Sequence, residues 1–189
     1  MRRSIDLGKR EIILDLCGGT GAWSKPYKDA GYDVRNITLP DNDVRTYVPP
    51  DNVYGILAAP PCTHLAGSGA RWWKDKGEDA LFEALAVVDA CIRIVYISAP
   101  KFWVIENPVG RLVRHLGKPD MYFNPCDYGD PWTKKTCLWG VFNKPAQNKV
   151  DPVPQSENPI WNQPPSPDRA KLRSITPPGF AKAFFEANR

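Results

Sequence analysis

Short apolar runs alternate with polar, glycine-rich and proline-rich stretches along the chain. Four runs contain many β-branched and aromatic residues, which predicts buried strands. They are EIILDL (11–16), YDVRNITL (32–39), VYGILAA (53–59) and KFWVIEN (101–107). A further strand is predicted at 135–142, KTCLWGVF.

Helical periodicity is clearest at residues 78–97, where apolar side chains recur every three or four positions. Shorter helices are predicted at 23–30, ended by Gly31, and at 112–116. Strands that alternate with helices predict an α/β fold with a mostly parallel sheet and helices on both faces. Ligands of such sheets bind beyond the carboxyl ends of the strands. The stretches CGGTG, APPC and ENP each follow a predicted strand, so we expect them to meet at that edge.

The sequence divides into three parts by composition. Residues 1–140 carry the alternating pattern and form the predicted core. Residues 141–178 are rich in Pro, Asn and Gln and predict an extended, irregular strap over the surface. Residues 179–189, GFAKAFFEANR, predict a closing amphipathic helix that packs back on the core.

Composition sets broad limits on function. The 189 residues carry a net charge of +4, a mild basic bias that suits a nucleic-acid or nucleotide partner. No apolar run is long enough to span a membrane, and the first six residues are charged and lack the apolar stretch of a secretory signal, so we expect a cytoplasmic protein. The five cysteines include no Cys-x-x-Cys pair and the histidines number two, so neither a disulfide framework nor a metal site is expected.

The glycines of LDLCGGTGAWS occupy a predicted strand-to-helix turn. Gly18, Gly19 and Gly21 allow positive φ and close approach of a ligand, although a tight structural turn explains them too. The spacing is neither that of a dinucleotide-binding loop nor that of a P-loop. After the next strand, Asp43 can accept a hydrogen bond from an adenine amino group or can be a solvated turn residue.

A thiol and a carboxyl follow two other predicted strands. Cys62 stands behind Pro60 and Pro61, which restrict the backbone that leads to it, and nearby cations or a following helix would depress the pKa of its thiol. Glu106 ends a very apolar strand, where burial would raise the pKa of its carboxyl and make it a proton donor. The alternative for Glu106 is an ion pair with Arg111 or Arg114.

In this order the motifs resemble the DNA cytosine-5 methyltransferases. For the cofactor, DLCGGTGAWS resembles the first motif of the family and DNDV resembles its acidic motif, while RSITPPGF is weakly similar to its last cofactor motif. For the reaction, APPCTHLAGSG resembles the Pro-Cys loop and VIENP resembles the Glu-Asn motif. The later stretch YGDPWTKKTCLWG resembles the Arg-x-Arg strand. The resemblance covers residues 12–140 and implies a Rossmann-like methyltransferase fold with S-adenosylmethionine as cofactor. The compact length is similar to that of phage-encoded members, which implies action in a host cytoplasm.

The resemblance also implies roles for particular residues. Cys62 would add to C6 of cytosine, Glu106 would hold and protonate N3, and Lys134 would be the remaining cation of the Arg-x-Arg motif. The cofactor would contact Asp15, Cys17, Gly18, Gly19, Gly21, Trp23, Asp43 and Pro60. The target base would contact Pro61, Thr63, His64, Asn107 and Pro108.

The sequence also departs from the family. Thr63 stands where the family has Gln, and Thr136 replaces the second arginine of Arg-x-Arg. The gap at about 141–173 is too short for a target recognition domain, so recognition is brief, or a protein partner supplies it, or the substrate is not duplex DNA. The open alternatives are the same chemistry on single-stranded nucleic acid or a free cytosine nucleotide, and a non-catalytic cofactor-binding or regulatory subunit.

Overall fold

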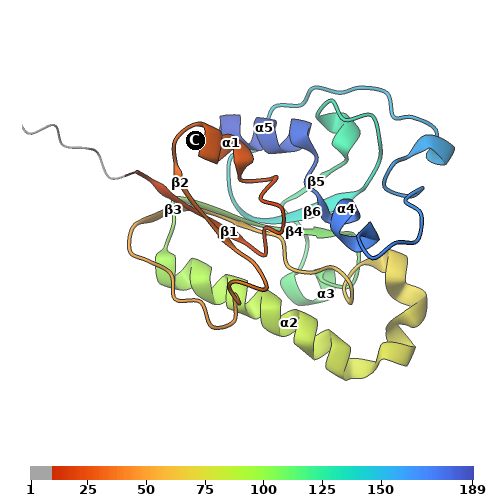
Figure 1. The fold of residues 1–189 in the computed structure, drawn as a ribbon, viewed down its shortest axis with the longest axis horizontal. Helices are drawn as coiled ribbons and strands as arrows, with labels where there is room; N and C mark the ends of the chain where they lie inside the picture. Colours follow the sequence, from red (N-terminus) through yellow and green to blue (C-terminus); the bar gives the residue numbers. More distant parts are fainter. Residues whose placement is uncertain (1–9) are drawn as a thin grey trace, which may run out of the picture.

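The computed structural model describes residues 10–189, in which one six-stranded sheet has helices on both faces (Figure 1). The strands are β1 (Ile12–Leu16), β2 (Asp33–Ile37), β3 (Val53–Ala58), β4 (Phe102–Pro108), β5 (Met121–Phe123) and β6 (Thr136–Val141). The helices are α1 (Lys25–Asp29), α2 (Trp73–Ser98), α3 (Val113–Leu116), α4 (Arg169–Ser174) and α5 (Pro178–Ala187). Short 3₁₀ helices lie at Gly67–Trp72, Pro125–Asp127 and Gln155–Glu157.

The sheet has the order β2-β1-β3-β4-β6-β5. The neighbours β2, β1, β3 and β4 pair in parallel, whereas β6 is antiparallel to both β4 and β5. The predicted α/β fold of the Rossmann-like type is therefore confirmed, with a single reversed strand among the described residues. The parallel strands bring the exits of β1, β3 and β4 to one edge, as expected.

Alternation along the strands divides the core between the two faces of the sheet. Ile13, Leu57 and Val104 belong to a buried cluster with aromatic residues of α1 and α5, among them Tyr27, Phe180 and Phe184. Leu14, Ile56 and Ile105 belong to the opposite cluster with Val88, Cys91 and Ile94 of α2. The closing helix α5 thus contributes large buried side chains to the core.

Most predicted elements lie close to their predicted positions. Helix α2 begins earlier, at Trp73, but its backbone breaks at Gly77, where φ is 72°, so the regular part starts where the periodic pattern does. The second strand ends at Ile37 rather than at residue 39. The sequence did not reveal β5 or α4, which are short, and α4 lies inside the strap predicted to be irregular.

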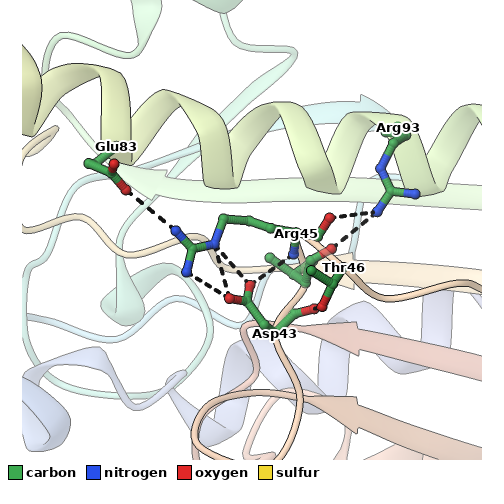
Figure 2. Close-up of polar contacts among 6 residues, drawn as sticks. Asp43, Arg45, Thr46, Glu83 and Arg93 are labelled. Atoms are coloured by element: carbon green, nitrogen blue, oxygen red, sulfur yellow. Dashed lines mark hydrogen bonds and ion pairs between the residues drawn. The ribbon is translucent and has the colours of Figure 1, made fainter.

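An ion-pair network fastens the loop after β2 to α2 (Figure 2). Arg45 forms an ion pair with Asp43, in which Nη2 lies 2.7 Å from Oδ2. It forms a second ion pair with Glu83 of α2, in which Nη1 lies 3.4 Å from Oε2. Arg93 of α2 donates to the carbonyl oxygen of Tyr47 at 3.0 Å and to that of Val44 at 3.3 Å. The loop beside the glycine turn is therefore held by side chains rather than by strand pairing.

Two sequence expectations concern the ends and composition of the chain. The absence of a secretory signal was inferred from residues that lie outside the described range. In residues 10–189 no helix combines the length and the hydropathy that crossing a membrane requires. The same residues contain no group of three or more His, Cys, Asp and Glu side chains placed to hold a metal ion.

Candidate active site

Asp15 lies at the end of β1 with its side chain fully buried. The hydroxyl of Ser24 donates to its Oδ2 at 2.5 Å, while Oδ1 has no hydrogen-bond partner among the described residues. Burial raises the pKa of the Asp15 carboxyl to about 6, and the hydrogen bond from Ser24 partly opposes that rise. A buried carboxyl oxygen beside the glycine turn is thus available to a ligand group.

The glycine turn after β1 has the backbone conformation that the sequence suggested. Cys17, Gly19 and Gly21 have φ of 57°, 53° and 71°, and the Gly21 N–H donates to the Gly18 carbonyl at 2.9 Å. A Cβ at Gly18 would lie 2.3 Å from Cγ of Asp15, so a side chain there would collide with the buried carboxyl. The turn is therefore a bare backbone surface in front of Asp15.

The Pro-Cys loop is fixed from both sides. The buried Asn107 side chain donates from Nδ2 to the carbonyl of Pro60 at 2.9 Å, and the Ala59 N–H donates to the carbonyl of Leu16 at 2.9 Å. The Cys62 carbonyl accepts the N–H of Leu65 at 2.9 Å. Asn107 is thus a positioning residue for the loop that carries Cys62.

Glu106 lies on the neighbouring strand end, because β3 and β4 pair with Ala58 opposite Ile105. Burial raises the pKa of its carboxyl, and Lys134 partly opposes that rise. Arg111, one candidate partner, instead donates to the His64 carbonyl at 2.7 Å and places its guanidinium over the Trp73 ring. Among the described residues Glu106 forms no ion pair with Arg111 or Arg114, so the carboxyl has the environment of a proton donor.

The pKa of the Cys62 thiol is raised, which is opposite to the direction that the sequence suggested. Burial is the largest cause and the neighbouring Glu106 is the next. Lys134 and Arg173 lower the pKa, but less than burial and Glu106 raise it. The thiol is therefore protonated at neutral pH unless the charges around it change.

One cavity at the carboxyl edge of the sheet brings most of the predicted site residues together. It is lined by Asp15, Cys17, Gly18, Gly19, Trp23, Pro60, Pro61, Cys62, Glu106, Pro108 and Lys134. It is also lined by Thr20, Ala59, Ser174 and Thr176, which the sequence analysis did not name. Ser174 and Thr176 belong to RSITPPGF, so the weak likeness of that stretch to a cofactor motif was the available signal.

Five predicted site residues do not line this cavity. Gly21 closes the glycine turn, and Asn107 donates a hydrogen bond to the carbonyl of Pro60. The carbonyl of the exposed Thr63 accepts a hydrogen bond from the ammonium of Lys76 at 3.3 Å. The Nδ1 of His64 is buried and has no partner among the described residues. The Asp43 carboxylate is engaged by Arg45, which holds its pKa below the usual range.

Helix α4 of the strap closes the cavity on the side of β6. The ammonium of Lys134 donates to the Arg173 carbonyl at 3.1 Å, and Ser174 follows directly into the cavity wall. Thr136, at the position of the second family arginine, is buried in β6 and donates its hydroxyl to the Lys134 carbonyl at 2.9 Å. Lys134 is thus the cation that faces Cys62 and Glu106.

Comparison with known proteins finds similarity to two methyltransferases. Type II methyltransferase M.DdeI of Desulfomicrobium norvegicum is 28% identical over 166 residues, which cover 65% of this chain and 38% of that protein. A Frog virus 3 protein named "Probable DNA (cytosine-5)-methyltransferase" is 26% identical over 147 residues, covering 67% of this chain and 69% of the relative. Over about two thirds of its length the chain is thus similar to a type II methyltransferase and to a probable DNA (cytosine-5)-methyltransferase. No protein-family model matches it.

The chain is much shorter than the type II methyltransferase that it matches. The chain spans 38% of the length of M.DdeI, and between β6 and the cavity residue Ser174 the structure has α4 and one 3₁₀ helix as its regular elements. A solved structure, the methyltransferase EhMeth of Entamoeba histolytica, aligns with a TM-score of 0.48 and 14% identity over 77% of this chain and 58% of its own.

Proposed function

We propose that this protein transfers a methyl group from S-adenosylmethionine to C5 of cytosine in DNA, through a covalent bond between Cys62 and C6 of the base. The observation that carries the proposal is that Cys62, Glu106 and Lys134 line one cavity together with the glycine turn that follows β1. The names of the relatives support the reaction class.

The residues around the glycine turn fit the cofactor. The unpartnered Oδ1 of Asp15 and the indole N–H of Trp23, which also lacks a partner among the described residues, offer one acceptor and one donor. The turn itself lets a ligand approach the backbone of Gly18 and Gly19 closely. When bound, the cofactor supplies an electrophilic methyl group, and these residues would hold its polar end.

The chemistry of the base follows from the two strand-end groups. The Cys62 thiolate attacks C6 of cytosine, and Glu106 donates its proton to N3, so that electron density is released toward C5. After C5 takes up the methyl group, the C5 proton passes to solvent, the thiolate departs, and N3 returns its proton to Glu106, which restores the aromatic ring. Lys134 stabilises the negative charge that passes between the thiolate and the carboxylate.

A carboxyl with a raised pKa suits the donor role, because it keeps its proton at a higher pH than an exposed glutamate does. A thiol with a raised pKa is a stronger nucleophile once it has been deprotonated. The reactive thiolate of Cys62 is therefore a minor form at neutral pH and a strong nucleophile when it forms.

The test is transfer of labelled methyl groups from S-adenosylmethionine to cytosine-containing DNA, with the product base identified by mass spectrometry. Cys62→Ala should abolish transfer, while Cys126→Ala, which changes another partly buried thiol outside the cavity, should retain it. Methylation at a position other than C5, or full activity of Cys62→Ala, would overturn the proposal.

A further inference from the structure

Two exposed tryptophans lie on segments that are hydrogen-bonded to neighbours of cavity residues, and each has an arginine near its ring. The bonded neighbours are Thr63, next to Cys62, and Thr133, next to Lys134. Trp72 is 45% exposed, with the guanidinium of Arg71 3.8 Å from the ring centroid. Trp161 is 41% exposed, with the guanidinium of Arg173 at 5.4 Å. The reaction proposed above uses neither tryptophan, although exposed aromatic rings of this size have a cost in water.

Trp72 is held next to the loop that carries the nucleophile. The 3₁₀ helix Gly67–Trp72 begins five residues after Cys62, and the Gly67 N–H donates to the Val109 carbonyl beyond β4 at 2.8 Å. Lys76, just after Trp72, donates to the Thr63 carbonyl at 3.3 Å. Trp72 therefore lies on a segment that these hydrogen bonds tie to the Cys62 loop and to the residue that follows β4, although Trp72 itself does not line the cavity.

Trp161 is held by hydrogen bonds that tie its turn to the segment leading into β6. Asn158 donates from Nδ2 to the Thr133 carbonyl at 3.0 Å, and the Trp161 N–H donates to the Asn158 carbonyl at 3.2 Å. The guanidinium of Arg173 lies over the Trp161 ring, and the carbonyl of Arg173 accepts a hydrogen bond from the ammonium of Lys134. Trp161 is thus on a segment tied to Thr133, the residue before Lys134. The segment at Gly67–Trp72 and helix α4 both lie at the right-hand side of Figure 1.

The positive charge is concentrated on the strap side. Helix α4 carries Arg169, Lys171 and Arg173 after Asp168, and the carbonyl of Arg173 accepts a hydrogen bond from Lys134. The start of α2 has a balanced set of Lys74, Lys76, Asp75, Glu78 and Asp79 after Arg71. A phosphate backbone is therefore attracted chiefly along α4, where the field also reaches the thiol of Cys62.

We propose that the Trp72–Arg71 and Trp161–Arg173 pairs stack on unpaired bases on either side of the target cytosine, so that the preferred substrate is single-stranded DNA. This inference rests on the proposed function. Base stacking on aromatic rings and guanidinium planes tolerates any sequence, since every base has a π-face. Sequence reading in a duplex needs a helix or ribbon in the major groove, whereas α4 has six residues and ends at the cavity.

The test compares the affinity of the wild-type protein for a short fluorescent DNA strand with its affinity for the duplex of the same sequence, by anisotropy at fixed salt. We expect the single strand to bind at least about tenfold more tightly, and Trp72→Ala and Trp161→Ala each to weaken that binding about tenfold. The matched control is Tyr96→Ala, an aromatic that is 82% exposed near the other end of α2. Trp72→Phe and Trp161→Phe should retain most of the affinity, and thermal melting checks that each variant is folded.

Equal or tighter binding of the duplex, or tryptophan variants that bind like Tyr96→Ala, would overturn the inference. Labelled-methyl transfer to both DNAs, measured in parallel, separates this failure from that of the proposed function. Transfer to the duplex that does not depend on either tryptophan removes the inference and leaves the function standing. Tryptophan-dependent binding of the single strand without transfer to any DNA removes the function itself.

Discussion

Glu106 raises the pKa of Cys62 across the gap between the ends of β4 and β3. Protonation of Glu106 removes this effect, because a neutral carboxyl no longer disfavours the thiolate form of Cys62. The two groups are thus coupled: the state in which Glu106 can donate a proton is also the state in which Cys62 is most easily deprotonated.

This coupling predicts that Glu106→Gln lowers the pKa of the Cys62 thiol, because the substitution removes a negative charge without changing the size of the side chain. Lys134→Met should raise that pKa, because it removes a nearby positive charge. The measurement is the rate of iodoacetamide alkylation at Cys62 against pH, followed by peptide mass spectrometry. If the pKa of the Cys62 thiol were unchanged in the two variants, or moved in the opposite directions, Glu106 and Lys134 would not set that pKa.

The rate of methyl transfer should depend on pH through the ionisation of Glu106 and Cys62. The productive form needs a neutral Glu106 and an anionic Cys62, and both have raised pKa values. The rate should therefore be nearly flat between the two pKa values, with a fall on the acid side at that of Glu106 and on the alkaline side at that of Cys62. In Glu106→Gln the carboxyl no longer titrates, so the residual rate should rise with pH up to the pKa of Cys62. A flat profile for this variant would contradict the assignment of the acid.

Asp15 predicts a pH-dependent stability. The pKa of its carboxyl is about 6 in the folded protein against 3.8 for an exposed group, so its contribution is present below about pH 4 and is lost as the pH rises through 6. Asp15→Asn lacks this titration, and its stability relative to the wild type should increase by about 3 kcal/mol between pH 4 and pH 7. Urea unfolding at several pH values measures the difference, and a constant difference would exclude a raised pKa.

The same substitution should weaken cofactor binding, because it replaces the unpartnered carboxylate oxygen beside the glycine turn by a neutral amide. Calorimetric titration with S-adenosylmethionine at pH 7 should therefore show weaker binding by Asp15→Asn than by the wild type. An affinity equal to that of the wild type would remove Asp15 from the cofactor site.

Asp43 remains a predicted contact of the adenine, although its carboxylate is engaged by Arg45 and does not line the cavity. Asp43→Asn and Glu83→Gln each remove one carboxylate partner of Arg45. If Asp43 also serves the cofactor, only Asp43→Asn should weaken the binding of S-adenosylmethionine. Equal effects of the two variants would assign Asp43 to fastening the loop on α2 (Figure 2).

The sequence predicted the core strands and the edge at which the site lies because alternating apolar runs and a glycine turn are local signals. It predicted that Cys62 and Glu106 meet, since both follow parallel strands. It could not give the sign of the pKa shift at Cys62, which depends on enclosure by segments far apart in the chain.

The strap illustrates a second limit. Helix α4 has six residues and exposed Leu172, so its stability depends on contacts such as Lys134 with Arg173 rather than on its own pattern. The role of Ser174 and Thr176 in the cavity wall follows from the same contact. Asn107 could be foreseen near the base, but its bond to the Pro60 carbonyl depends on the register of β3 and β4.

The central claim is that Cys62 attacks the base, and the most direct test is intact-protein mass spectrometry with DNA that contains 5-fluorocytosine. After incubation with S-adenosylmethionine, the account predicts a stable adduct whose mass is that of the protein plus the methylated DNA. The adduct should be absent from Cys62→Ser and present in Cys126→Ser. An adduct that persists in Cys62→Ser, or none with any DNA although the cofactor binds, would contradict the account.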